Sequence, residues 1–96
     1  MSVVSVFAQL TVANTAVGLA AGTLTHAGGE QMTKFVCRLE TAQIRYRTDG
    51  TDPTATVGTI LDVNDTLFIT SPDDAARIRF IRTGGTSGVL NVEGFR

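Results

Sequence analysis

Residues 43–54 constrain the fold more than any other stretch of the sequence. Ile44 and Tyr46 alternate with polar residues, which is the period-2 pattern of a strand with one buried face. Asp49 and Gly50 then predict a turn, because Gly accepts a positive φ and an Asp side chain bonds to backbone just ahead of it. A proline three residues later has no N–H for a ladder and ends the strand. The stretch predicts a strand, a turn and a change of direction, and it contains no motif that identifies a substrate.

Similar short alternating segments recur along the chain, with turn residues between them. They are expected at residues 7–13, 16–19, 32–40, 59–61, 66–70, 77–82 and 88–95. Their inward positions are Leu10, Val12, Phe35, Cys37, Leu39, Ile78, Phe80, Leu90 and Val92. Short strands spaced roughly 8–12 residues apart are typical of a β-sandwich or a small barrel. We therefore predict an all-β fold: a single small β-sandwich, immunoglobulin-like or jelly-roll-like, of about seven or eight short strands.

One helical turn is expected at residues 71–76. Ser71 is a favourable N-cap, and Pro72 suits the first helical position. Asp73 and Asp74 lie near the positive end of the helix dipole. The apolar run that follows is too short to predict a longer helix.

Charge is nearly absent from the N-terminal third. Only 18% of the residues are charged, below the usual ~25%, and Glu30 is the only charged side chain in residues 1–33. Such a segment suits burial against other protein, although two ordinary buried strands and a loop would explain it equally well. We predict one domain, residues 1–96, in which residues 1–13 form an assembly-contact arm or an edge strand. The expected contacts, in a homodimer or homotrimer, are Val4, Val6, Phe7 and Leu10.

Arginine outnumbers lysine seven to one. The arginines expected at outward positions of two strands are Arg45, Arg47, Arg77, Arg79 and Arg82. The planar guanidinium binds carboxylates and stacks well, so arginine is enriched at protein interfaces. A solvated basic face, or charges that block edge pairing, is the alternative. We predict that Arg45, Arg47 and Arg79 contribute to a protein interface. The net charge of −1 provides no field for nucleic acid, and no such partner is expected.

The residues that could carry chemistry have simpler explanations. The acidic pairs at 49/52, 62/65 and 73/74 suit turns and a helix start, and none has the spacing of a calcium loop, so no metal is expected. Cys37 lies in an apolar strand and His26 in a glycine-rich loop, residues 22–31, so a catalytic dyad is not expected. Neither an enzyme nor a cofactor is predicted.

The single cysteine leaves no intrachain disulfide, which suits assembly in a reducing cytoplasm. The apolar N-terminus has no basic residues before it and is interrupted by Gln9, Thr11 and Asn14. Neither a signal peptide nor a membrane span is expected.

Three parts of the sequence resemble small virion proteins of tailed bacteriophages. They are residues 37–54 (CRLETAQIRYRTDGTDPT), residues 57–59 (VGT) and residues 80–86 (FIRTGGT), and the resemblance extends over roughly residues 7–96. Some of these virion proteins are capsid decoration, or cement, proteins. Residues 46–54 are also similar to a hairpin in the C-terminal sandwich domain of β-hexosaminidases, which supports only the fold.

The first resemblance implies a phage virion structural protein, most directly a capsid decoration protein that binds the assembled head and stabilises capsomer contacts. Its partner would be the major capsid protein, and its place the capsid surface of a virion assembled in the host cytoplasm. It would add stability because it binds the assembled state and not its parts. The alternative is a tail- or fibre-associated module that recognises a carbohydrate or receptor, which would need exposed aromatic platforms. A third reading is an accessory domain of an enzyme.

Overall fold

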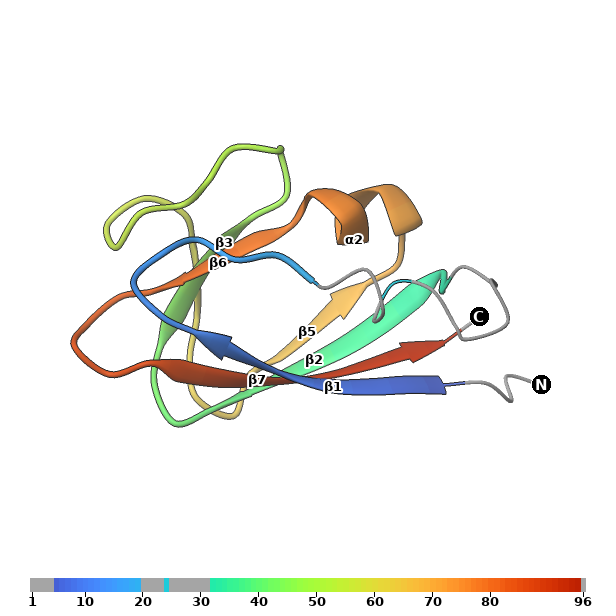
Figure 1. Ribbon diagram of the computed structural model, residues 1–96, viewed down its shortest axis with the longest axis horizontal. Coiled ribbons are helices and arrows are strands. Elements are labelled where there is room, and N and C mark those ends of the chain that lie inside the picture. The colour runs from blue at the N-terminus through green and yellow to red at the C-terminus, as the bar shows by residue number, and fades with distance from the viewer. Residues whose placement is uncertain (1–4, 20–23, 25–31, 96) are drawn as a thin grey trace.

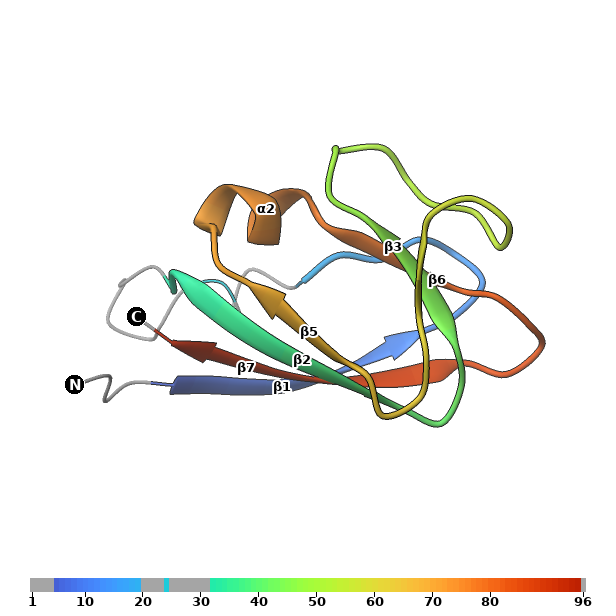
Figure 2. The same ribbon diagram turned by 180° about the vertical axis from the view of Figure 1, so that it is seen from behind.

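The computed structural model describes residues 5–19, 24 and 32–95, which form two antiparallel sheets (Figure 1, Figure 2). The four-stranded sheet has the order β1-β7-β2-β5, with β1 at Ser5–Val12, β7 at Gly88–Phe95, β2 at Lys34–Glu40 and β5 at Thr66–Ile69. The three-stranded sheet has the order β4-β3-β6, with β4 at Thr59–Leu61, β3 at Ile44–Arg47 and β6 at Arg79–Arg82. Because the two sheets pack face to face, the predicted all-β sandwich is confirmed.

The core lies between the two layers, and strand alternation decides which side chains enter it. One inward row crosses the larger sheet as Ala8, Val92, Cys37 and Leu67. The buried apolar side chains are Val12, Met32, Phe35, Cys37, Leu39, Ile44, Leu61, Ile69, Ala75, Ile78, Phe80, Leu90 and Val92. Every predicted inward position is in this set except Leu10 and Tyr46, which are half-buried and pack against it.

The helix α2 spans Pro72–Arg77 and joins β5 to β6. The backbone N–H of Asp74 donates to Oγ of Ser71 at 3.4 Å, which caps the helix as the sequence predicted. Ala75 is the buried residue of α2 and holds it on the core. Arg77 belongs to the last turn of α2, so the prediction that it lies on a strand is wrong.

Residues 16–19 do not form the short return strand that the sequence suggested. Instead this segment crosses to the other layer and runs beside β6, where Val17 and Phe80 exchange backbone hydrogen bonds of 2.9 and 2.8 Å. The backbone N–H of Arg82 also donates to the carbonyl oxygen of Ala13 at 3.0 Å. β1 pairs with β7 instead of with its neighbour in sequence.

Arg82 also departs from its predicted outward position. It lies directly opposite Ile44 in the register of β3 and β6, and opposite residues of an antiparallel pair share a face. Because Ile44 is fully buried, Arg82 has the inward phase at the end of its strand, where its Nη1 donates to Oγ of Ser87 at 3.2 Å. Val4 and His26 lie outside the described residues.

Candidate functional site

An open hollow of about 410 Å³ lies at one end of the three-stranded sheet. It is lined by Tyr46, Arg47, Thr48, Asp49, Val57, Gly58 and Thr59. Tyr46 is half-buried and tilts against Phe80, with ring centroids 6.4 Å apart and 51° between the ring planes. The core residue Phe80 therefore packs against one side of the Tyr46 ring, and β3 ends beside the hollow.

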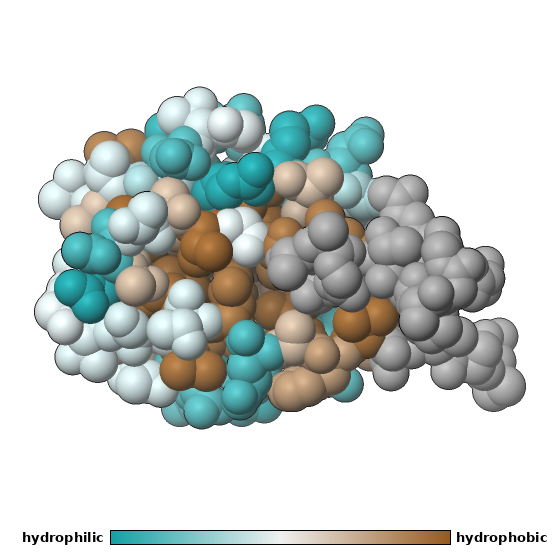
Figure 3. Space-filling view, in the orientation of Figure 1, coloured by the Kyte–Doolittle hydropathy of each residue, from teal (hydrophilic) through white to brown (hydrophobic). Residues whose placement is uncertain are grey.

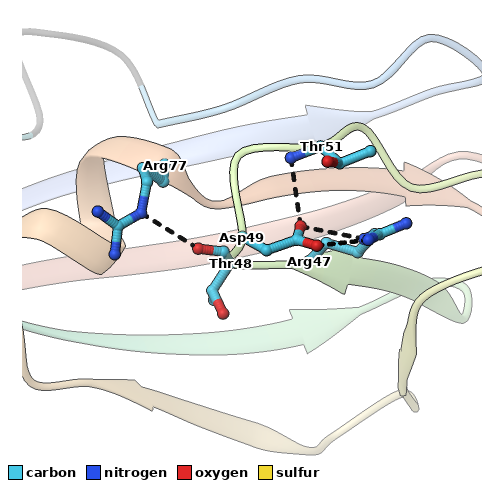
Figure 4. A network of polar contacts seen from close by, with 5 residues as sticks. All are labelled: Arg47, Thr48, Asp49, Thr51 and Arg77. Carbon is cyan, nitrogen blue, oxygen red and sulfur yellow. Dashed lines mark hydrogen bonds and ion pairs between the residues drawn. The ribbon is translucent and has the colours of Figure 1, made fainter.

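Arg47 and Asp49 both line this hollow. They belong to the polar network drawn in Figure 4. Nε of Arg47 donates to Oδ1 of Asp49 at 3.1 Å, and Nη2 of Arg47 pairs with the second carboxylate oxygen. The backbone N–H of Thr51 donates to Oδ1 of Asp49 at 3.2 Å, and Gly50 has a φ of 85°. This is the turn that the sequence predicted, with Asp and Gly in the expected roles. The hydrogen bond from Arg47 lowers the pKa of Asp49 below its usual 3.8, and the same contact raises the pKa of Arg47.

Arg77 binds the same turn from α2. Its Nε donates to the carbonyl oxygen of Thr48 at 3.4 Å (Figure 4). Its Nη2 lies 3.1 Å from Oδ1 of Asp74. The helix and the β3 turn are thereby linked across the end of the sheet.

Arg45 holds the loop that leads from the turn to β4. Its Nε donates to the carbonyl oxygen of Ala55 at 3.0 Å, and its Nη1 donates to that of Gly58 at 2.7 Å. Gly58 has a φ of 138°, and a Cβ there would lie 3.1 Å from Cβ of Pro53 and 3.2 Å from Cβ of Arg45. The loop folds back so tightly on Arg45 that only glycine fits at this position.

Arg79 binds the chain in the same way. Its Nη1 donates to the carbonyl oxygen of Ile78 at 2.8 Å and to that of Ala76 at 3.2 Å. The arginines predicted as interface residues, Arg45, Arg47 and Arg79, are all half-buried and all donate to neighbouring parts of their own chain. A role for them in binding another protein stays a prediction.

The outer face of the four-stranded sheet carries a different kind of surface. Phe7 is 63% exposed and Phe68 is 67% exposed. The strand registers place both on one row that crosses all four strands, with Glu93 and Val36 between them. The two rings are therefore at opposite edges of one face, roughly 14 Å apart at three strand spacings. Phe68 was not among the predicted site residues, although its phase, opposite to that of the inward Leu67 and Ile69, indicates it.

The next row on this face is polar and internally bonded. Nε2 of Gln9 donates to Oδ1 of Asn91 at 2.9 Å, and Nδ2 of Asn91 donates to Oε2 of Glu40 at 2.7 Å. Arg38 lies opposite Asn91 in the same row and is exposed. The face thus alternates between a row with two phenyl rings and a row of satisfied amides and charges.

β1 is the longest edge strand of the sandwich, with eight residues. Its inward residues Val6 and Leu10 pack against the core but are only half-buried. Figure 3 has the orientation of Figure 1, in which β1 lies toward the viewer. In this view, hydrophobic residues gather in the middle of the molecule, between the two layers. Predicted contacts Val6, Phe7 and Leu10 are thus together on one strand, whereas the predicted arginines lie on the other sheet.

Cys37 is fully buried, and burial raises the pKa of its thiol to about 12. A protonated, enclosed thiol is a poor nucleophile, as expected for a cysteine that serves packing. Among residues 5–19, 24 and 32–95, no group of three or more His, Cys, Asp or Glu side chains is placed to hold a metal ion. In the same residues, no helix has both the length and the apolar character needed to cross a membrane.

Comparisons of this chain with protein-family models, with curated proteins and with solved structures found no match.

Proposed function

We propose that this protein is a structural component of a tailed-phage virion, a capsid decoration protein that binds the assembled head and stabilises its capsomer contacts. The observation that carries the proposal is the row on the outer face of the four-stranded sheet, with Phe7 and Phe68 both more than 60% exposed. Phe68 lies beside the half-buried Val36, and contiguous exposed apolar surface marks sites that bind other proteins. The sequence resemblance to small virion proteins gives the partner, the major capsid protein.

The docking surface in this proposal is the phenylalanine row with the polar row beside it. Aromatic side chains are enriched in the centres of protein interfaces, and charged side chains are common at their rims. The charged side chains around the rings are of both signs, since Arg38 and Lys34 accompany Glu40 and Glu93 on this face. A surface with charges of both signs provides no net field of one sign toward its partner.

The experiment is binding of purified protein to heads that lack it. Phe68→Ala should weaken binding by about 2 kcal/mol or more, roughly 30-fold, because truncating an aromatic hot-spot residue of an interface typically costs that much. Ile60→Ala is the matched control, since Ile60 is 43% exposed but lies on the other sheet. Both variants should keep the wild-type free energy of unfolding within about 0.5 kcal/mol. Wild-type occupancy of the heads by Phe68→Ala would contradict the proposed surface, and failure of the wild-type protein to bind any head would contradict the function.

The second candidate is a tail- or fibre-associated module that binds a carbohydrate or receptor, and the hollow beside Tyr46 favours it. Ligand sites combine apolar and aromatic side chains with a few polar groups that fix the ligand's orientation, and this hollow combines Tyr46 and Val57 with the Arg47–Asp49 pair. Binding to a glycan array that Tyr46→Ala abolishes would support this function over the first. Unchanged glycan binding by Tyr46→Ala would exclude the hollow as the site.

A further inference from the structure

We propose that β1 pairs with β1 of a second copy of this chain, antiparallel and across a twofold axis, so that two four-stranded sheets join into one sheet of eight strands. This inference goes beyond the virion assignment and does not depend on it. It starts from the contrast between β1 and the other strand edges of the sandwich.

As far as the structure describes the chain, β1 has none of the features that protect an edge strand. Its sequence has no charged residue, proline or glycine, and its register with β7 runs without a bulge from Ser5 to Val12. Alternate residues of such a strand direct their N–H and C=O groups away from the sheet, which makes it a template for another strand. Among the described residues, β1 pairs only with β7.

The other edges are shorter or covered. β5 has four residues and β4 has three. The free side of β6 already binds the chain segment Ala13–Val17 through the backbone hydrogen bonds of Phe80 and Arg82. Within residues 5–19, 24 and 32–95, β1 is therefore the one strand with a long, regular and open edge.

The partner is a second copy because β1 is complementary to itself. In an antiparallel pair, opposite residues lie on the same face, so a twofold axis brings inward residues against inward residues and outward against outward. Val6 and Leu10 would meet apolar residues of the other copy, and Gln9 and Thr11 would stay on the outer face. A strand without charge also has no like-charge repulsion against its own copy.

Burial selects one register among the symmetric ones. Val12 is already fully buried, whereas Val6 and Leu10 are half-buried although they reach the core. The register with Ala8 opposite Ala8 of the second copy places Val6 opposite Leu10, and so covers both residues that the single chain leaves half-exposed. In this register Phe7 lies opposite Gln9 of the second copy on the outer face.

Analytical ultracentrifugation of the full chain tests the dimer. At concentrations up to about 100 μM, we expect the mass of two chains rather than the 10.1 kDa of one. Leu10→Lys should weaken the dimer at least about 100-fold, because the ammonium group reaches solvent past an open edge but is enclosed when the edge is paired. Leu67→Lys is the matched control: Leu67 is equally half-buried and inward, but lies on the opposite edge strand β5, and the variant should remain a dimer.

Cross-linking tests the register without disturbing the core. Phe7→Cys and Gln9→Cys each place a thiol on the outer face, and the native Cys37 is buried and does not compete. Directly opposite residues have Cα atoms about 4.5–5.5 Å apart, within disulfide range, whereas residues two positions out of register are at or beyond that range. A mixture of the two variants should therefore form disulfide-linked dimers faster than either variant alone.

Two results would overturn the inference: a wild-type chain that sediments as a monomer throughout, or a mixture that cross-links no faster than the single variants. If Leu10→Lys does not fold, the cross-linking result decides by itself. The outcomes are separate from those of the proposed function. A chain that dimerises but binds no head refutes only the virion assignment, and a monomer that binds heads refutes only the β1 pairing.

Discussion

The two outer faces of the sandwich use their large side chains in opposite ways. On the three-stranded sheet, Arg45, Arg47 and Arg79 donate to carbonyl or carboxylate oxygens of their own chain. On the four-stranded sheet, Phe7 and Phe68 are mostly exposed. The smaller sheet is thus covered by its own long loop, which Arg45 and Arg47 hold, and the described residues provide no such cover for the outer face of the larger sheet.

The difference shows what an excess of arginine means in a short β chain. The connection from β3 to β4 exposes backbone carbonyls that no strand can pair, and a guanidinium group can bind two of them at once. Arginine therefore replaces secondary structure as the partner of this loop. The three predictions below test whether the two faces differ in this way.

The largest effect is expected at Gly88, where β7 packs against the start of β3. A Cβ on Gly88 of β7 would lie 2.7 Å from Cγ2 of Ile44 and 2.8 Å from the carbonyl oxygen of Ala42. Gly88→Ala should therefore lower the free energy of unfolding by about 3 kcal/mol, because a buried backbone atom cannot move aside easily. Urea unfolding followed by circular dichroism measures the change.

Gly84→Ala is the control for Gly88→Ala, since nothing lies within 4 Å of a Cβ at that position. It should change the free energy of unfolding by less than about 0.5 kcal/mol. Equal free energies of unfolding for the two variants would mean that the two sheets are not packed closely at Gly88. The outer faces of the sheets could then not be treated as two sides of one rigid unit.

The second effect separates a structural arginine from a solvated one. Arg45→Met keeps most of the apolar stem but removes the donors to Ala55 and Gly58, and should cost about 2 kcal/mol of unfolding free energy. Arg38→Met makes the same change on the other sheet, where the side chain is exposed, and should be close to neutral. The difference between the two variants in thermal unfolding is the measurement. Equal costs would remove the distinction between the two faces.

The smallest effect concerns the Arg47–Asp49 pair and depends on pH. Because the folded-state pKa of Asp49 is below 3.8, the pair stabilises the fold above that pH, and the contribution is lost as the pH falls through the folded pKa. Asp49→Asn should thus lower the melting temperature slightly at neutral pH, and the difference from wild type should vanish in strong acid. Asp52→Asn removes the same charge three residues further on, where the structure describes no ion pair, and should leave the melting temperature nearly unchanged at neutral pH. A pH-independent difference for Asp49→Asn would contradict the ion-pair account.

Much of the fold was predictable from the sequence because the signals are local. Alternation indicated the strands, and Ser71 with Pro72 indicated the start of α2. The order of the strands was not predictable, since β7 inserts between β1 and β2 through contacts between residues more than forty positions apart. The same long-range pairing explains why residues 16–19 do not form a return strand. The inner side of β1 pairs with β7, and residues 16–19 lie beside β6 instead.

The candidate surfaces were predictable only in part. The absence of charge in β1 pointed to Val6, Phe7 and Leu10, and the structure places them on one open edge strand. Residue type alone could not reveal that Arg45 binds a loop ten residues further on, because that depends on how the loop folds back. Phe68 was missed because a phenylalanine in an apolar strand is usually assigned to the core. Its exposure follows only from strand alternation, since its neighbours Leu67 and Ile69 both point inward.

The central position of β7 has a consequence for the order of events during synthesis. β7 follows every other described strand in the chain, yet it pairs with β1 on one side and β2 on the other. The larger sheet therefore cannot close until residues 88–95 have left the ribosome, and until then the sides of β1 and β2 that β7 will cover have no native partner. Folds dominated by such distant pairings form slowly, so the nascent chain passes through an interval in which it exposes more open strand than the finished molecule does.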